Sequence, residues 1–347
     1  MDTTTNDLPS NSALLNQTNN LNEQLLEAIR RGDATAITTL LADPDILINQ
    51  VDTNGWTALM WAASRGHTAT VTALLAIPCI EVNHANNKGE TALMWAARCG
   101  HTATVAELLT APGILVNQAN NNGETALMLA SFNNHLTTVA KLLTAPRILV
   151  NQADNNGMTA LMLATSWKDT ATFAALLAVP DILVNLANNK GETPLMLATR
   201  YGHMNIVSAL IKKGVDFLAV NNNGKTALML ATAKYCRDSS YNKIVTTLRD
   251  ASLAQLRQRW GNMSDVLNMM PSALVPIIAG YDIPPGLCEN PKQEQEIQRT
   301  LLKFFNEKTR AAQTTGEAME IEPEQVASTA PTNRHPNKRR TRSFTRD

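Results

Sequence analysis

A short motif, Gly-x-Thr-(Ala/Pro)-Leu-Met-(Trp/Leu)-Ala, returns six times in this chain at an almost constant step. Its glycines are Gly55, Gly89, Gly123, Gly157, Gly191 and Gly224, so four steps are 34 residues long and the last is 33. Self-similarity at a period of about 20 to 50 residues is typical of solenoid proteins. We therefore expect a stack of like units, each touching its neighbours, in place of one globular core.

Each unit carries the signals of a turn followed by two short helices. Asn or Asp residues precede the glycine, a run that favours a tight turn with positive φ. The following Thr is a good helix cap, and Pro194 after Thr193 suits the first helical turn. In the first unit we expect one helix to end at Gly66 and a second to span residues 68–75. Prolines end the second helices, again at steps of 34 residues: Pro44, Pro78, Pro112, Pro146 and Pro180.

This pattern resembles the ankyrin repeat over roughly residues 21–252. The resemblance implies an all-α solenoid of helix-turn-helix repeats joined by β-hairpin-like loops. The family usually has His after the Leu of the motif, where this chain has Met60, Met94, Met128, Met162, Met196 and Met229. That column is either an adaptable binding or thioether metal stripe or a packed ladder between repeats, and we favour the packed ladder.

The same register divides the chain into four parts. Residues 1–20 read as a disordered leader, and 21–252 as an N-terminal capping repeat plus six repeats. Residues 253–313 are patterned as a short helical C-terminal region, and 314–347 as a disordered charged tail. The sixth repeat has four extra residues within 235–241, which favours an atypical terminal repeat over a functional loop.

Composition excludes several classes of function. The formal net charge of zero gives no general attraction to nucleic acid or acidic membranes. Cys79, Cys99, Cys236 and Cys288 have no paired spacing, which favours a reducing, cytoplasmic setting without disulfides or a metal site. No apolar run reaches membrane length, and the first 20 residues lack the features of a signal peptide. We expect a monomer without cofactors.

Catalysis is not expected either. The histidines follow the repeat, and none is paired in sequence with Cys or Ser as nucleophile and base. No glycine-rich phosphate loop appears. A cryptic enzyme would have to be built in residues 253–313, which contain one Cys and no His.

The ankyrin resemblance implies a protein partner on the concave side, against the turn tips and the ends of the first helices. Residues at these positions vary between the repeats while the flanking positions barely do, as expected for a rigid frame with one chosen partner. Aromatic and Arg side chains there are typical interface anchors, although scattered exposed apolar residues are also common. Trp61 and Trp95 share the register of core leucines, so we assign them to the core. The predicted partner-binding residues are Trp56, Arg65, Arg98, Phe132, Met158, Trp167, Arg200 and Tyr201.

Two further resemblances suggest where such a scaffold would act. Asn-rich turns, glutamates at 317–324 and Phe344 near the end resemble ankyrin-containing type IV secretion effectors of intracellular bacteria. That resemblance implies action on a host protein in the host cytosol, and the basic run at 338–342 would permit nuclear entry. Residues 270–281 resemble an F-box-like segment, which implies the alternative of a substrate adaptor for a cullin-type ubiquitin ligase. The effector scaffold is the interpretation we favour.

Overall fold

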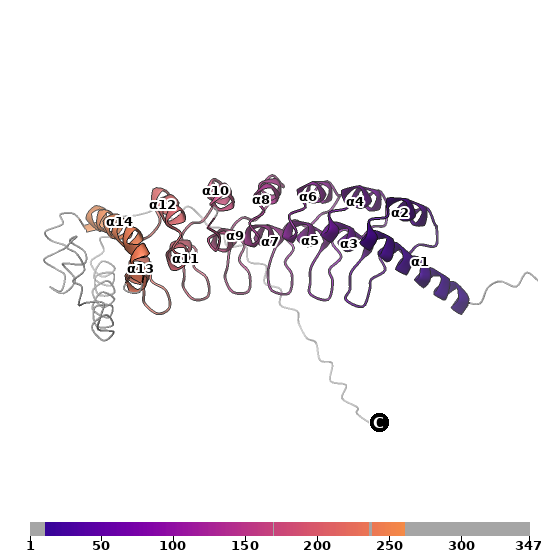
Figure 1. The fold of residues 1–347 in the computed structure, drawn as a ribbon, viewed down its shortest axis with the longest axis horizontal. Helices are drawn as coiled ribbons and strands as arrows, with labels where there is room; N and C mark the ends of the chain where they lie inside the picture. The colour runs from indigo at the N-terminus through magenta and orange to yellow at the C-terminus, as the bar shows by residue number, and fades with distance from the viewer. Residues whose placement is uncertain (1–10, 169, 236–237, 261–347) are drawn as a thin grey trace, which may run out of the picture. The chain divides into compact units, whose positions relative to one another are not determined.

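The computed structural model describes residues 11–260 except 169, 236 and 237, and these form pairs of short helices stacked side by side (Figure 1). The N-terminal unit contains α1 (Asn11–Arg31) and α2 (Ala34–Leu41). The six repeats contain α3 (Ala58–Arg65) and α4 (Thr68–Leu75), α5 (Ala92–Arg98) and α6 (Thr102–Leu108), α7 (Ala126–Phe132) and α8 (Leu136–Leu143), α9 (Ala160–Ala164) and α10 (Ala171–Leu177), α11 (Pro194–Tyr201) and α12 (Met204–Lys212), and α13 (Ala227–Tyr235) and α14 (Asn242–Trp260), with the 3-10 helix η1 (Ser239–Tyr241) before α14.

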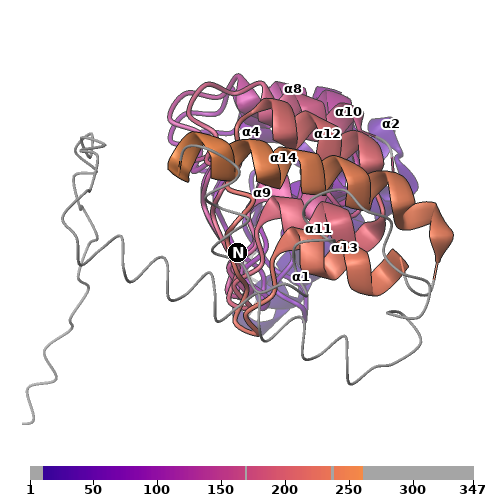
Figure 2. The ribbon, with the colours of Figure 1, turned by 90° about the vertical axis from the view of Figure 1, so that its left-hand side faces the viewer.

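The first helices of the units lie in one row and the second helices in another (Figures 1 and 2). The loops that enter the first helices extend to one side of both rows (Figure 1). Within the described residues the only β structure is an isolated antiparallel bridge between Ala153 and Thr159. The loops are therefore turns, and the described part of the repeat solenoid is helical, as the sequence predicts.

Each first helix begins at the predicted threonine. The Thr57 hydroxyl oxygen accepts a hydrogen bond from the Met60 backbone N–H at 3.3 Å, which satisfies one of the free donors of the first turn. Pro194 occupies the first helical turn after Thr193. The same Thr-to-Met cap recurs at Thr91, Thr125, Thr159, Thr193 and Thr226.

The core is a continuous ladder of small and long apolar side chains contributed by every repeat. The methionines after the motif leucines are buried, which confirms the packed ladder and leaves them unavailable as a surface stripe. These residues are Met60, Met94, Met128, Met162, Met196 and Met229.

Histidines at the turn between the two helices tie the second, third and fifth repeats to the repeats before them. His135 Nε2 lies 3.0 Å from the Arg98 carbonyl oxygen, and His101 Nε2 lies 3.1 Å from that of Ser64. Since a carbonyl only accepts, the ring nitrogen donates in each pair. Tyr241 holds the corresponding position in the last repeat, and its hydroxyl donates to the Arg200 carbonyl at 3.0 Å. The longer connection in the sixth repeat forms η1, which ends at Tyr241 and so places this tyrosine where other repeats have histidine.

Asparagines in the turns form a second set of ties between repeats. Asn155 Nδ2 donates to the Asn121 carbonyl at 2.9 Å, and Asn189 Nδ2 donates to the Asn155 carbonyl at 2.8 Å. The Asn121 amide does the same to the Asn87 carbonyl at 3.1 Å. The Asn-rich composition of the turns therefore serves contacts between repeats as well as turn conformation.

Both ends of the repeat domain differ from the sequence prediction. Helix α1 begins at Asn11, so the predicted disordered leader at 1–20 is wrong for 11–20. Ala13, Leu14 and Leu15 favour a helix, which extends easily once nucleated. At the other end α14 runs through the predicted boundary at residue 252 to Trp260. The helical region beyond 260, the F-box-like segment at 270–281 and the tail at 314–347 lie outside the described residues.

Candidate functional site

The candidate site is the inner face, which we define as the surface of the turn tips before the first helices together with the ends of those helices. Three of its predicted residues, Phe132, Trp167 and Tyr201, come from three successive repeats and are exposed by 50%, 41% and 46%. The Trp167 indole N–H donates to the Phe132 carbonyl, and the Tyr201 ring stacks on His203 with 5.9 Å between centroids. We call these three residues the aromatic patch.

Local helix geometry explains why the aromatic patch is exposed. Helices α7 and α11 end at Phe132 and Tyr201, so these side chains stand at the rim of the helix row. Helix α9 ends early at Ala164, which places Trp167 in the turn that follows. Large apolar patches on a protein surface commonly mark interaction sites.

A second group of aromatic residues, the tryptophan cluster, lies at the N-terminal end of the inner face. Its members are Trp56, Trp61 and Trp95, with ring centroids 4.5 Å apart for Trp56 and Trp61 and 4.4 Å for Trp56 and Trp95. The Arg30 guanidinium lies 4.5 Å from the Trp61 ring centroid, and the Arg98 guanidinium lies 5.2 Å from that of Trp95. The two arginines thus flank the three rings with cation–π contacts.

The assignment of Trp61 and Trp95 to the core holds only in part. Both are half-buried, and Trp61 packs against the core, but each also contacts Trp56 at the inner face. This position in the repeat lies at the edge of the core, because Leu163 and Leu230 there are also half-buried. An indole is larger than a leucine side chain and extends further toward the surface. The signal missed in the sequence is that Trp56 precedes Trp61 by five residues within a single turn and helix start.

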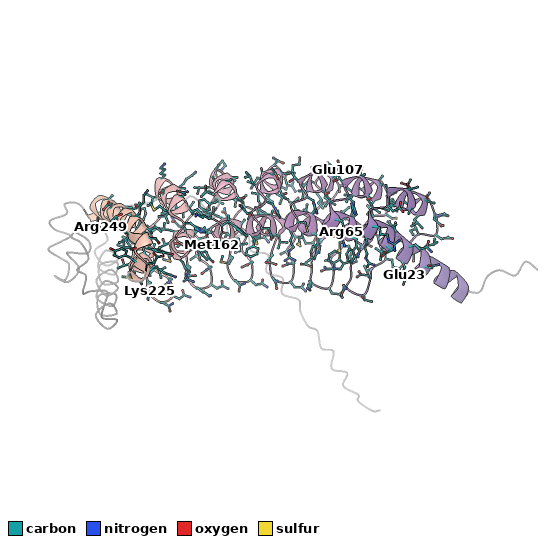
Figure 3. All side chains as sticks on the ribbon, viewed as in Figure 1. Glu23, Arg65, Glu107, Met162, Lys225 and Arg249 are labelled. Atoms are coloured by element: carbon teal, nitrogen blue, oxygen red, sulfur yellow. The ribbon has the colours of Figure 1, made fainter. Side chains whose placement is uncertain are left out.

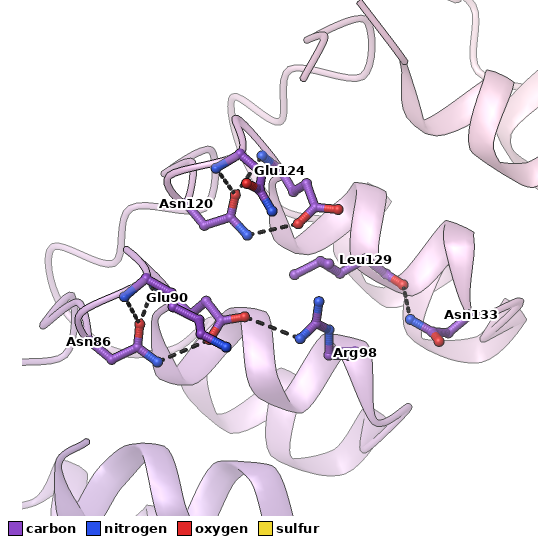
Figure 4. Close-up of polar contacts among 9 residues, drawn as sticks. Asn86, Glu90, Arg98, Asn120, Glu124, Leu129 and Asn133 are labelled. Carbon is purple, nitrogen blue, oxygen red and sulfur yellow. Dashed lines mark hydrogen bonds and ion pairs between the residues drawn. The ribbon is translucent and has the colours of Figure 1, made fainter. Parts of the chain in front are cut away.

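A buried carboxylate fixes the position of Arg98. Glu90 Oε1 accepts from Arg98 Nη1 at 3.1 Å, and Glu90 Oε2 accepts from Asn86 Nδ2 at 3.0 Å (Figure 4). Burial of Glu90 makes this pair more than a loose surface contact. The Glu192–Arg200 ion pair repeats the arrangement three units later.

Glu124 has the same bond from its turn asparagine but no arginine of this kind. Asn120 Nδ2 donates to Glu124 Oε2 at 2.9 Å (Figure 4). Phe132 occupies the register of Arg98 and Arg200, so within the described residues Glu124 forms no ion pair. The inner face therefore has a negative charge between the tryptophan cluster and the aromatic patch.

The remaining predicted site residues differ in availability. Arg65 is exposed at the end of α3 and forms no ion pair with any described residue. Met158 is half-buried, and its sulfur accepts from Asn188 Nδ2 at 3.3 Å, so it serves a contact between repeats. Arg98 and Arg200 are held by glutamates, and Trp56 belongs to the tryptophan cluster. The aromatic patch and Arg65 are thus the freest of the predicted residues.

The described residues contain no group of three or more His, Cys, Asp or Glu side chains placed to hold a metal ion. Within the same part of the chain, every helix is too short or too polar to cross a membrane.

The thiol of Cys99, directly after α5, provides a first test of this geometry. Although Cys99 is an exposed residue, partial burial of its thiol raises the thiol pKa, and the positive charge of Arg98 opposes the rise. Because the thiolate is the reactive form, we expect native Cys99 to react with iodoacetamide more slowly than in urea-unfolded protein at pH 8. Its native rate should rise as the pH approaches the raised pKa. Peptide mass spectrometry measures both rates, and equal native and unfolded rates at pH 8 would contradict the placement.

Comparison with known proteins agrees with this architecture. The family model for ankyrin repeats in three copies matches residues 25–119, 113–185 and 176–255. No curated protein matches the chain.

Among solved structures, the repeats are similar to the ankyrin repeat domain of Bcl-3, a member of the IkappaB protein family, at 22% identity with a TM-score of 0.54, covering 60% of this chain and 92% of that one. They are similar to the ankyrin repeat domain of human ASB11 at 26% identity with a TM-score of 0.52, covering 59% and 89%. A chain from the complex of a Bdellovibrio bacteriovorus predatory endopeptidase with an immunity protein is 32% identical, with a TM-score of 0.49 and coverage of 55% and 97%.

Proposed function

Because this chain belongs to the ankyrin-repeat family, we propose that it is a non-enzymatic scaffold that binds one protein partner on its concave inner face. The ankyrin-repeat fold is generally a non-enzymatic interaction module. The observation that supports this site is the aromatic patch, in which Phe132, Trp167 and Tyr201 expose large rings on successive repeats. Aromatic side chains contribute much of the binding energy at protein interfaces.

The chemistry of the inner face suggests how a partner is held. Apolar side chains of the partner pack against the aromatic patch and exclude water from it. Arg65 offers five N–H donors without an ion-pair partner among the described residues, and Glu124 offers a carboxylate. The tryptophan cluster adds a rigid aromatic surface at the N-terminal end.

The setting we propose is a bacterial effector that acts on a host protein inside the host cell. The support is compositional: Asn-rich turns within the repeats and glutamates at 317–324 near the C-terminus. In this setting the partner is a host protein, and the scaffold acts as a monomer in the host cytosol.

The test is affinity capture from eukaryotic lysate with full-length protein, followed by a direct affinity measurement on the captured partner. The Trp167→Ala/Tyr201→Ala variant is expected to weaken the affinity by about 30-fold or more, because each removed ring is an anchor worth at least about 1 kcal/mol. Identification by mass spectrometry and titration calorimetry supply the readout.

The matched control is Leu149→Ala/Leu183→Ala, which removes two equally exposed apolar side chains from the loops after the second helices. Its affinity should equal that of the parent protein. If both double variants weaken the affinity equally, the inner face is not the binding site. A partner lost only with Leu274→Glu would move the function to the F-box-like segment at 270–281 and favour the ubiquitin-ligase adaptor.

A further inference from the structure

A hollow of about 810 Å³ lies between α1 and the first turn, at the N-terminal end of the inner face. Glu23 marks its position on α1 (Figure 3). We call it the N-terminal hollow. Its lining residues include Glu23, Glu27, Arg30, Leu47, Val51 and Asp52.

The hollow follows from the way turns stack on one another. Each later turn covers the one before it: the Asn87 backbone N–H donates to the Asn54 carbonyl at 3.2 Å, and Asn121 donates to Lys88 at 3.0 Å. The N-terminal unit begins with helix α1 and has no Gly-x-Thr entry turn, so within the described residues no turn of the stacked kind precedes the one at 52–55. The N-terminal side of that turn is consequently left open toward α1.

The polar lining of the hollow has an excess of negative charge. Three carboxylates, on Glu23, Glu27 and Asp52, stand against one guanidinium, on Arg30. Arg30 lies 3.8 Å from a carboxylate oxygen of Glu27 and 3.8 Å from one of Asp52, a long ion pair in each case. Glu27 also forms a close ion pair with Arg31, whose Nε lies 2.7 Å from Glu27 Oε1, so Glu27 adds little to the excess charge. Glu23 forms no ion pair with any described residue. A cation entering the hollow therefore meets two carboxylates, those of Glu23 and Asp52, that the chain itself neutralises incompletely.

The rest of the lining suits the stem of a long side chain. Leu47 and Val51 expose apolar surface beside the carboxylates, and Leu26 is half-buried. Arginine and lysine combine an apolar stem with a charged head that stays near polar groups. A volume of this size falls in the range of sites that hold small ligands.

We propose that the N-terminal hollow receives an arginine or lysine side chain of the protein partner. That the basic group belongs to a protein rests on the function proposed above. The Asp52 and Glu23 carboxylates hold the charged head, and Leu47 and Val51 contact the stem. The partner thus places a basic residue at this end of the repeats and apolar residues on the aromatic patch.

The indole N–H of Trp61 reports on the hollow directly, because it donates to Asp52 Oδ2 at 3.2 Å. The experiment titrates ¹⁵N-labelled full-length protein with N-acetyl-arginine N-methylamide and with the lysine equivalent. The neutral citrulline compound has nearly the same shape as the arginine compound and serves as the ligand control. We expect a saturable shift of the Trp61 indole signal in the millimolar range with one or both basic compounds. The signal is assigned from the spectrum of Trp61→Phe.

Asp52→Asn removes one of the charges without disturbing the turn. Asn86 makes the same bonds in the second repeat that Asp52 makes in the first, each accepting from two backbone N–H groups of its turn. We expect Asp52→Asn and Glu23→Gln each to weaken the titration by about fivefold, the size of the contribution of one ion pair near the surface. Asp154→Asn makes the same change at the same register in the fourth repeat and should leave the titration unchanged.

Three outcomes would overturn the proposal: no saturable shift at Trp61, an equal shift with citrulline, or an unaltered titration in both Asp52→Asn and Glu23→Gln. The titration uses no partner protein, so loss of capture through the aromatic patch and loss of binding in the hollow are separate results. If the hollow binds the basic compounds and Trp167→Ala/Tyr201→Ala still captures the partner, only the proposal that the aromatic patch binds the partner is refuted.

Discussion

Replacement of Leu161 with alanine is expected to lower the free energy of unfolding by about 2 to 5 kcal/mol, measured by circular dichroism during urea denaturation. Leu161 lies in α9 with no exposed surface, so its removal loses apolar burial and leaves a cavity between repeats. The cavity is costly because every repeat depends on its neighbours for its core.

Leu149→Ala is the matched control, because it makes the same chemical change at a side chain that is 59% exposed. We expect it to change the free energy of unfolding by less than about 0.5 kcal/mol. Asn155→Ala falls between the two, near 1 kcal/mol, since it removes the hydrogen bond to the Asn121 carbonyl. Similar losses for Leu161→Ala and Leu149→Ala would contradict the register of the repeats.

Gly100→Ala is expected to cost about 1.5 to 3.5 kcal/mol in the same measurement. Gly100 has φ of +75°, which costs an L-residue about 1 to 2 kcal/mol. An added Cβ would also lie 2.6 Å from His135 Nδ1, and must displace the ring that donates to the Arg98 carbonyl. Loss of that hydrogen bond adds about 0.5 to 1.5 kcal/mol.

Gly113→Ala separates these two causes. Gly113 has nearly the same φ, +73°, but a Cβ there would meet nothing within 4 Å. This variant should lose only the backbone contribution, about 1 to 2 kcal/mol. In a His135→Ala background, Gly100→Ala should likewise lose only that contribution. An equal effect of Gly100→Ala with and without His135 would show that the histidine contact does not stabilise the stack.

Local signals account for most of what the sequence predicts correctly. The 34-residue period sets the repeats, and Thr57 and its equivalents fix the helix starts, because a cap needs only residues adjacent in sequence. The exposure of Phe132, Trp167 and Tyr201 follows from their register at the helix ends. Each of these features depends on one repeat at a time.

The sequence does not predict features that depend on which side chains meet across repeats. The tryptophan cluster joins Trp61 to Arg30 of the N-terminal unit and Trp56 to Trp95 of the next repeat. The N-terminal hollow exists because α1 replaces a turn, which no spacing in the sequence reveals. Likewise, the start of α1 at Asn11 lies in a segment whose Asn and Thr content favoured a disordered leader.

The asparagine hydrogen bonds between turns follow the period of the repeats. Asn155 donates to the repeat before it and its carbonyl accepts from the repeat after it, and Asn121 does the same. Excision of one interior unit, such as residues 120–153, would bring Asn155 against the Asn87 carbonyl and restore the same bond. The length of the repeat domain can therefore change in steps of one repeat without loss of these hydrogen bonds. Loss or gain of one unit would change the span between the N-terminal hollow and Tyr201 by one repeat while the bonds between turns are kept.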